Sequence, residues 1–293
     1  MGLRHTAASL KGDIKMKTKI TTLDFKKMKE EGRKLRMVTA YDYQMAALVD
    51  KTDIELILVG DSLGMVVLGY EETISVTMED MIHHIKPVVK GAPNTFIVGD
   101  MPFGSYNVSV DKAVENAIRL MKEGGCDCIK LEGGVNIADK IEAIVDAGIP
   151  VMGHIGLTPQ TSSQLGGFKV QGKDVKAAKE ILEDAKAVEA AGAFSVVVEC
   201  VPAQIGKIIS ETLEIPTIGI GAGVYCDGQV LVTQDMIGMF DQFVPKFVKQ
   251  YADVGNMIVE AFNSYGREVQ EGKFPGDVHS FNMKQEVLDE LLK

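Results

Sequence analysis

Six short apolar runs in this chain each end on a residue that can bind a metal ion or transfer a proton. Strands that run in one direction bring the residues at their carboxyl ends to one edge of a sheet, and parallel α/β enzymes place their active sites at that edge. The recurrence therefore predicts a parallel α/β enzyme more strongly than any single motif does. The six terminal residues are Asp42, Asp61, Asp100, Glu132, His154 and Glu199.

Helical patterns alternate with the apolar runs, and this alternation predicts right-handed βαβ units. Seven to eight such units predict closure into a (β/α)8 TIM barrel, with a helix before it and a helical extension after it. A barrel typically needs ~250 residues, and the chain has 293. A doubly wound open sheet is the alternative. The strands are expected over 35–41, 54–60, 94–99, 126–132, 149–154, 194–199, 215–220 and, as the eighth, 228–233.

The two ends of the chain differ from its centre. Between residues 1 and 19, five basic residues stand against one acidic residue, Asp13, and the apolar segment of a secretion signal is missing. We expect a disordered leader over 1–19 rather than a targeting signal. Residues 20–293 are expected to form one barrel domain, whose helical tail is interrupted at 272–276.

The charge balance narrows the class of partner. A net charge of −10 and a pI of about 5.1 argue against a nucleic-acid-binding protein, which would carry a basic face. Anionic small substrates remain compatible, because a bound cation reverses the local field. No apolar stretch approaches the ~20 residues of a membrane span. The four cysteines form no CxxC pair, so a cytoplasmic protein with free thiols is expected.

Three of the strand-terminal acids form the central hypothesis about chemistry. A barrel would bring Asp61, Asp100 and Glu132 together at its rim, and carboxylate oxygens with few His or Cys neighbours suit a hard cation such as Mg²⁺. Such a site would leave positions open for water and a chelating substrate. The alternative is that each acid only caps the helix that follows it.

Glu199 and Lys130 are the candidates for proton transfer and anion binding. Glu199 follows an apolar strand, where loss of hydration makes a carboxylate a better base near neutral pH. Lys130 stands two residues before Glu132, so both side chains should face the barrel interior, where an ammonium group suits an anionic substrate. Two alternatives stay open: a salt bridge between Glu199 and Lys130, and a Schiff base on Lys130 as in aldolases.

Four further residues stand close to these in the sequence. Ser62 could offer its hydroxyl or N–H to a substrate carboxylate, or could cap a turn. His154 could hydrogen-bond the substrate, orient a neighbouring carboxylate, or be structural. Tyr41 and Asp42 end the first strand and are expected to contact the substrate or the groups that bind it.

Taken in chain order, the motifs that contain these residues resemble those of the ketopantoate hydroxymethyltransferase family (3-methyl-2-oxobutanoate hydroxymethyltransferases). Eleven collinear motifs over about 18–282 carry the resemblance, which is more specific than any one of them. Among them are Thr39-Ala-Tyr-Asp, Val59-Gly-Asp-Ser-Leu-Gly-Met, Gly99-Asp-Met-Pro-Phe, Lys130-Leu-Glu-Gly-Gly, Gly153-His-Ile-Gly-Leu-Thr-Pro-Gln, Gly167-Phe-Lys-Val-Gln-Gly and Glu199-Cys-Val-Pro. The basic leader and the last dozen residues lie outside the pattern.

The resemblance implies a (β/α)8 fold and an enzyme of pantothenate biosynthesis. Such an enzyme transfers a hydroxymethyl group from 5,10-methylenetetrahydrofolate to 3-methyl-2-oxobutanoate through a Mg²⁺-stabilised enolate, giving 2-dehydropantoate. The resemblance also implies a cytoplasmic homo-oligomer, often a decamer, with no nucleic-acid or membrane partner.

The resemblance also assigns roles by position. It makes Asp61, Asp100 and Glu132 the metal site, with Glu132 acting through water. Asp61, Ser62, Asp100 and Lys130 are implied to contact the keto acid. Glu199 is implied to be the proton acceptor.

Two other classes of function remain as alternatives. A Mg²⁺-dependent C–C lyase of the phosphoenolpyruvate or isocitrate lyase type would also use a barrel and an enolate, but its Lys-Lys-Cys-Gly-His motif does not occur. A binding barrel without catalysis is disfavoured by the intact set of acids.

Overall fold

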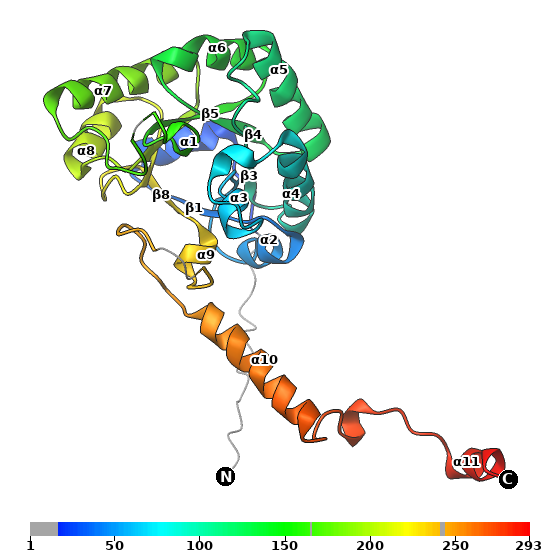
Figure 1. Cartoon of the computed structure of the whole chain (residues 1–293). Helices are drawn as coiled ribbons and strands as arrows, with labels where there is room; N and C mark the ends of the chain where they lie inside the picture. The colour runs from blue at the N-terminus through cyan, green and yellow to red at the C-terminus, as the bar shows by residue number, and fades with distance from the viewer. Residues whose placement is uncertain (1–16, 165, 241–243) are drawn as a thin grey trace. The chain divides into compact units, whose positions relative to one another are not determined.

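The computed structural model describes residues 17–164, 166–240 and 244–293. In this part of the chain, eight parallel strands form a closed barrel, each paired with its neighbours in chain order (Figure 1). Leu35 lies opposite Gly228, so the last strand pairs with the first and closes the barrel. The predicted TIM barrel is confirmed, and the open sheet is excluded. The strands are β1 Leu35–Thr39, β2 Leu56–Val59, β3 Phe96–Asp100, β4 Cys128–Glu132, β5 Val151–Gly156, β6 Ser195–Glu199, β7 Thr217–Ile220 and β8 Gly228–Leu231.

The strand boundaries differ from the predicted ones by one or two residues. The largest consequence is in β5, which we predicted to end at His154 but which continues to Gly156. Gly156 pairs with Glu199 of β6, and this pairing extends the strand. His154 therefore projects from within β5 rather than from the loop after it.

Helices surround the barrel, and short polar side chains begin several of them (Figure 1). The side chains of Asp42, Thr77, Ser109 and Asp174 each accept a hydrogen bond from a backbone N–H in the first turn of the helix that follows. Such caps satisfy N–H groups that have no partner within the helix. The helices are α1 Thr22–Glu30, α2 Tyr43–Val49, α3 Leu63–Val66, α4 Met78–Gly91, α5 Val110–Arg119, α6 Ala138–Asp146, α7 Val175–Ala190, α8 Ala203–Thr212, α9 Thr233–Met236, α10 Val254–Gln270 and α11 Gln285–Leu291.

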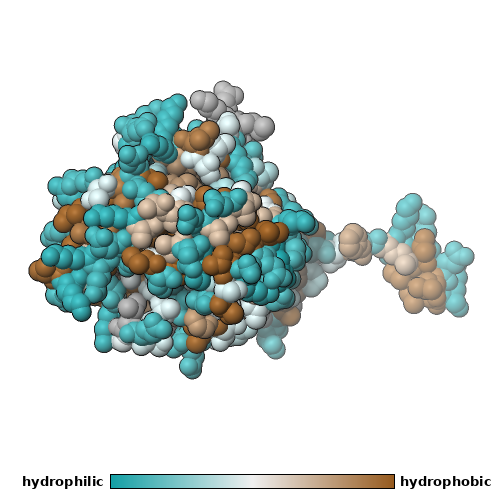
Figure 2. Space-filling model, turned by 90° about the horizontal axis from the view of Figure 1, so that it is seen from above, coloured by the Kyte–Doolittle hydropathy of each residue, from teal (hydrophilic) through white to brown (hydrophobic). Residues whose placement is uncertain are grey.

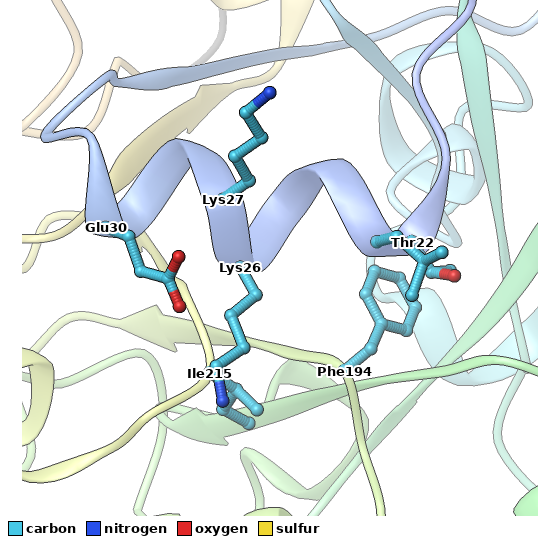
Figure 3. Close-up of a pocket in the computed structure, with 7 residues that line it drawn as sticks. Thr22, Lys26, Lys27, Glu30, Phe194 and Ile215 are labelled. Atoms are coloured by element: carbon cyan, nitrogen blue, oxygen red, sulfur yellow. The ribbon is translucent and has the colours of Figure 1, made fainter.

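Helix α1 packs against the amino end of the barrel. Phe25 is fully buried there, with ring centroids 5.3 Å from Phe96 and 4.9 Å from Phe194 in edge-to-face contacts. A groove of about 400 Å³ runs beside α1, with Lys26 and Glu30 on the helix and Ile215 facing it (Figure 3). The groove lies at the opposite end of the strands from the predicted acids, so it is not the candidate active site.

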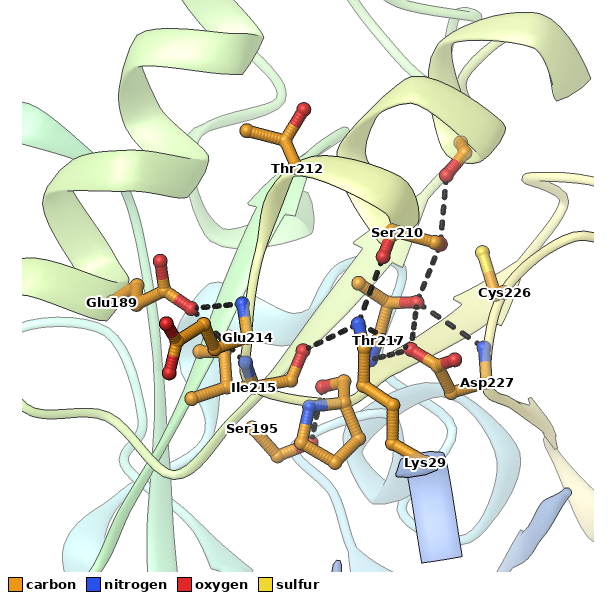
Figure 4. Close-up of polar contacts among 12 residues, drawn as sticks. Lys29, Glu189, Ser195, Ser210, Thr212, Glu214, Ile215, Thr217, Cys226 and Asp227 are labelled. Carbon is orange, nitrogen blue, oxygen red and sulfur yellow. Dashed lines mark hydrogen bonds and ion pairs between the residues drawn. The ribbon is translucent and has the colours of Figure 1, made fainter. Parts of the chain in front are cut away.

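A hydrogen-bonded lysine joins α1 to the amino ends of two strands (Figure 4). Lys29 Nζ donates to Ser210 O at 2.8 Å, to Ile215 O at 3.1 Å and to Asp227 Oδ2 at 3.0 Å. The same carboxylate oxygen accepts from the N–H and the hydroxyl of Thr217, at 2.9 and 3.0 Å. Every donor of this half-buried ammonium group is therefore used.

The described part of the predicted leader contacts the barrel. Lys17 Nζ donates to Thr95 Oγ1 at 2.8 Å and to the carbonyl of Ile54, and Lys19 forms an ion pair with Asp127 at 2.7 Å. Residues 1–16 lie outside the described residues, so a disordered leader there stays a prediction.

The chain divides into two compact units, the second of which covers Gln234–Lys293. The fold of 20–293 as one domain stays a prediction. In the second unit, the segment between α10 and α11 includes the predicted break at 272–276 and a short 3-10 helix, η5 Asp277–His279. Neither α10 nor α11 buries a residue. Apolar side chains stand among hydrophilic ones near α11 (Figure 2). No described helix has both the length and the apolar character to cross a membrane.

Candidate active site

The carboxyl ends of neighbouring strands bring the predicted acids together in the barrel. Asp100 ends β3, Glu132 ends β4 and Glu199 ends β6, while Asp61 follows β2 by two residues. The pairing register places Asp100 beside Lys130 and Glu132 beside His154. Because the strands are parallel and adjacent, residues far apart in the sequence meet at one edge of the barrel.

A buried ion pair forms between Lys130 and Asp100. Lys130 Nζ lies 3.0 Å from Asp100 Oδ1, and the two side chains are only 3% and 2% exposed. The backbone N–H of Asp61 donates to the other oxygen, Asp100 Oδ2, at 3.2 Å. Burial acts to lower the pKa of Lys130, but the charges of Asp100 and Glu132 outweigh it and raise that pKa. The amine therefore stays protonated, which disfavours a Schiff base because that reaction needs a neutral amine.

His154 bridges two acids from neighbouring strands. Its Nδ1 lies 3.3 Å from Glu132 Oε1, and its Nε2 lies 3.0 Å from Glu199 Oε2. Burial and the nearby Lys130 act to lower the pKa of His154, but the two carboxylates outweigh them and raise it to about 9. A pKa raised in this way favours the imidazolium form of His154 at neutral pH. Its contact of 3.2 Å with Lys130 Nζ is then a repulsion between cations rather than a hydrogen bond.

Asp61 lies near two other carboxylates, those of Asp100 and Glu132. Burial and the charges of Asp100 and Glu132 raise the pKa of Asp61 well above its usual range. Burial likewise raises the pKa of Asp100, although Lys130 opposes this. The opposite holds for Glu132: burial acts to raise its pKa, but His154 and Lys130 outweigh it and lower that pKa. The site thus gathers negative charge that its own cations only partly neutralise.

The oxygen donors of this cluster fit a hard divalent cation. Asp100 Oδ1 is buried and accepts no hydrogen bond of good geometry, even from Lys130 Nζ at 3.0 Å. Among the residues that the structure describes, no three His, Cys, Asp or Glu side chains converge closely enough to hold an ion by themselves. Mg²⁺ commonly uses one or two carboxylates and completes its coordination with water and substrate. Asp61 and Asp100 are the donors that suit this arrangement.

Of the remaining predicted residues, Ser62 and Tyr41 hydrogen-bond each other, whereas Asp42 caps a helix. Ser62 Oγ hydrogen-bonds Tyr41 Oη at 2.8 Å, so the tyrosine holds the hydroxyl predicted to contact substrate. Asp42 is exposed and accepts a hydrogen bond from the N–H of Met45 at 2.8 Å as the cap of α2. Its contact with substrate or with substrate-binding groups stays a prediction.

Backbone geometry positions Glu199. Gly156 has a φ of +92°, and a Cβ there would lie 2.3 Å from the carbonyl oxygen of Glu199. The N–H of Leu157 donates to that same carbonyl at 2.9 Å, and Cys200 adopts a φ of +48° directly after the glutamate. A glycine is needed at 156 because a side chain would displace the strand that carries Glu199.

Sequence reasoning assigned no role to Gln160 and Tyr106, yet Gln160 contacts two of the acids and Tyr106 contacts Gln160 and the backbone of Glu132. Gln160 Nε2 donates to Asp61 Oδ2 at 2.9 Å, and its backbone N–H donates to Glu132 Oε2 at 3.0 Å. Tyr106 donates to Gln160 Oε1 at 2.6 Å. The only available signal for Gln160 was its place at the end of a motif after β5, because an uncharged amide reveals no pairing by itself.

Comparisons with known proteins agree on one family. A family model described as ketopantoate hydroxymethyltransferase matches residues 19–277. The 3-methyl-2-oxobutanoate hydroxymethyltransferase of Heliobacterium modesticaldum is 63% identical over 272 residues, covering 93% of this chain and 99% of the relative. The enzyme of the same name from Clostridium acetobutylicum is 60% identical, covering 94% of this chain and 100% of its own.

Solved structures of much lower sequence identity share the fold. A phosphonopyruvate hydrolase in complex with oxalate and Mg²⁺ matches with a TM-score of 0.58 at 11% identity, covering 93% of this chain and 97% of that one. A 2,3-dimethylmalate lyase of the PEP mutase/isocitrate lyase superfamily matches with a TM-score of 0.56 at 12% identity, covering 94% and 95%. At such identities the likeness concerns the barrel alone.

Proposed function

The chain belongs to the ketopantoate hydroxymethyltransferase family, and from this premise we propose which of its residues carry out the reaction. The reaction is that of the 3-methyl-2-oxobutanoate hydroxymethyltransferases of pantothenate biosynthesis, with 5,10-methylenetetrahydrofolate as the one-carbon donor. The observation that carries the residue assignment is the buried network of Asp100, Lys130, Glu132, His154 and Glu199 at the carboxyl end of the strands.

Lys130 and Ser62 bind the keto acid in this proposal. The protonated Lys130 supplies positive charge for the substrate's oxygens, and burial strengthens that attraction because little water screens it. Ser62, held by Tyr41, supplies a hydroxyl to the carboxylate. Asp61 and Asp100 would hold Mg²⁺, with Glu132 acting through water. The ion, when bound, would polarise the oxygens of the keto acid and so make its C3 proton easier to remove.

Glu199 removes the proton from C3. Its side chain is 15% exposed, more open than the 2% of Glu132, so it can reach a substrate at the mouth of the barrel. His154 positions the accepting carboxylate from one side through its contact of 3.0 Å. The C3 carbon forms a bond to the folate-borne methylene carbon, the two bonds from that carbon to the folate nitrogens break, and water supplies the hydroxyl oxygen. The two folate nitrogens take up one proton from that water and one that balances the proton accepted by Glu199. The products are 2-dehydropantoate and tetrahydrofolate.

A C–C lyase function is not favoured. The two hydroxymethyltransferases above share 60% or more of their residues with this chain. The lyase compared shares 12% of its residues and hence only the fold.

We also propose that the protein is a cytoplasmic homo-oligomer, with a decamer as the expected state. Exposed apolar side chains on α10 and α11 support association, since Met257 and Phe262 are each 69% exposed and Leu291 is 72% exposed. The four cysteines, all among the described residues, are free, which agrees with a reducing compartment.

Exchange of the C3 proton of 3-methyl-2-oxobutanoate with deuterated water tests the role of Glu199. In Glu199→Gln we expect exchange to fall by about 10²–10⁴-fold, the usual contribution of a general base, with keto-acid binding largely retained. Glu189→Gln is the control, because Glu189 accepts backbone hydrogen bonds from Glu214 and Ile215 at the amino end, away from the acids. Near-normal exchange in Glu199→Gln would remove Glu199 from this role.

A further inference from the structure

We propose that Gln160 is a positioning residue that fixes Asp61 for cation binding and couples Asp61 to Glu132. The inference rests on the proposed function, because it takes Asp61 as a ligand of the divalent cation. Gln160 follows β5 and is only 3% exposed, yet it carries no charge and takes no direct part in the proton transfer. Its contribution is to hold two acids: Glu132 at the end of β4, and Asp61 two residues after β2.

Every polar atom of the Gln160 side chain has a partner. Its Nε2 donates one hydrogen bond to Asp61 Oδ2 at 2.9 Å and a second to the carbonyl of Met101, also at 2.9 Å. Its Oε1 accepts from Tyr106 at 2.6 Å. The backbone N–H adds a bond to Glu132 Oε2 at 3.0 Å. A single residue therefore links two acids that come from β2 and β4.

The chemistry of the partners determines which way the amide points. Asp61 Oδ2 and Met101 O are both acceptors, so only the NH2 group of Gln160 can face them. Tyr106 fits the same orientation: its hydroxyl accepts from the N–H of Glu132 at 3.2 Å and donates its own proton to Gln160 Oε1 at 2.6 Å. A flipped amide would place Gln160 Oε1 against two acceptors, Asp61 Oδ2 and Met101 O, and would lose the hydrogen bond that Tyr106 donates.

An uncharged donor suits this position better than a charged one. A lysine or arginine here would pair with Asp61 and compete with the cation for its oxygens. A carboxylate would add a further negative charge to a cluster that is already crowded. An amide aims one oxygen of Asp61 and leaves the charge of that side chain available, as groups behind metal ligands generally do.

Binding of Mn²⁺ to the substrate-free protein, followed by electron paramagnetic resonance, tests the inference without turnover. In Gln160→Met, which keeps the length and the backbone N–H but removes the amide, we expect the Kd for Mn²⁺ to rise about 10–100-fold. In kinetics, the activity of this variant should recover toward the wild-type kcat at high Mg²⁺. Tyr106→Phe removes only the hydroxyl that donates to Gln160 Oε1, so the Kd for Mn²⁺ should rise by a smaller factor than in Gln160→Met.

Ser210→Ala is the control for loss of stability alone. Its hydroxyl bonds Gly206 O and Thr217 Oγ1 near the amino end of the barrel, so its loss should lower the unfolding temperature without changing the Kd for Mn²⁺. If Gln160→Met and Tyr106→Phe bind Mn²⁺ as the wild type does, the inference is wrong and the proposed function is untouched. If the wild type itself binds no Mn²⁺, the proposed metal site fails and the inference with it.

Discussion

Each end of this barrel holds a lysine against acidic side chains: Lys29 is half-buried at the amino end, and Lys130 is buried at the carboxyl end. At the amino end, Lys29 has three good acceptors and faces one carboxylate, Asp227, which takes further hydrogen bonds from Thr217 (Figure 4). At the carboxyl end, Lys130 faces three acids, and Asp100 Oδ1 lacks a hydrogen bond of good geometry. At the amino end, all the hydrogen-bond donors of the lysine have acceptors. At the carboxyl end, negative charge remains that the cations do not balance.

The contrast separates a stabilising network from a reactive one. A buried charge whose partners are all present stabilises the fold or is neutral to it, whereas crowded like charges cost free energy. The raised pKa of Asp61 expresses that cost, because the folded protein disfavours its ionised form. A site that must attract a cation and an anionic substrate can use this imbalance, and the amino end has no such need.

The first test of the contrast is Asp61→Asn. We expect a loss of activity of about 10²–10³-fold, comparable to removal of one electrostatic group from an active site. We also expect the metal-free variant to unfold at a higher temperature, by about 2–4 °C for each ~1 kcal/mol of repulsion removed. Because the pKa of this acid is raised in the fold, the wild type should gain stability from lowering the pH, and the variant should gain less. Calorimetry without added metal checks this, and a less stable variant would contradict it.

The second test exchanges each lysine for methionine. Lys130→Met leaves buried acids without their cation, so we expect a loss of about 3–5 kcal/mol in the free energy of unfolding together with most of the activity. Lys29→Met leaves Asp227 its bonds from Thr217, so we expect a smaller loss, about 1–3 kcal/mol, with unchanged kcat/KM. Urea unfolding and steady-state kinetics measure both. Equal kinetic losses in the two variants would remove the distinction between the ends.

A third test uses pH on His154. Its pKa of about 9 lies above its unfolded value, so the stability it contributes as a cation is complete below about pH 6.5 and is lost as the pH rises through about 9. We expect the wild-type unfolding temperature to decline over this range. In His154→Gln that decline should be weaker, with proton exchange reduced about 10-fold at neutral pH. An unchanged pH profile in the variant would show that His154 is neutral in the folded protein.

The smallest effects are expected from removing one hydroxyl group at each end of the barrel, that of Tyr41 or that of Ser210. Tyr41→Phe removes the bond to Ser62 Oγ, and we expect the KM for the keto acid to rise a few-fold with kcat little changed. Ser210→Ala at the other end should cost about 1 kcal/mol of stability with an unchanged KM. Initial-rate measurements over a range of keto-acid concentration check both variants. A KM that rises in Ser210→Ala would mean that the two ends are coupled.

The sequence was sufficient for the architecture and for most of the acids. Alternating apolar runs and helices predict a parallel barrel, since each strand needs two covered faces and a crossover helix. The barrel then brings Asp100 and Glu132 to one edge, and the strand period places Lys130 on the same side as Glu132. The errors are at the boundaries, as in β5, because the pairing partner across the sheet determines where a strand stops.

Tertiary structure alone decided which groups contact the acids. His154 joins Glu132 to Glu199, and Gln160 lies 99 positions from the Asp61 that it holds. These pairings depend on the stagger of neighbouring strands and on the path of the loop after β5, and neither leaves a periodic mark in the sequence. Local residue patterns specify which strands and helices form, whereas the partners of a buried amide or imidazole follow only from the closed barrel.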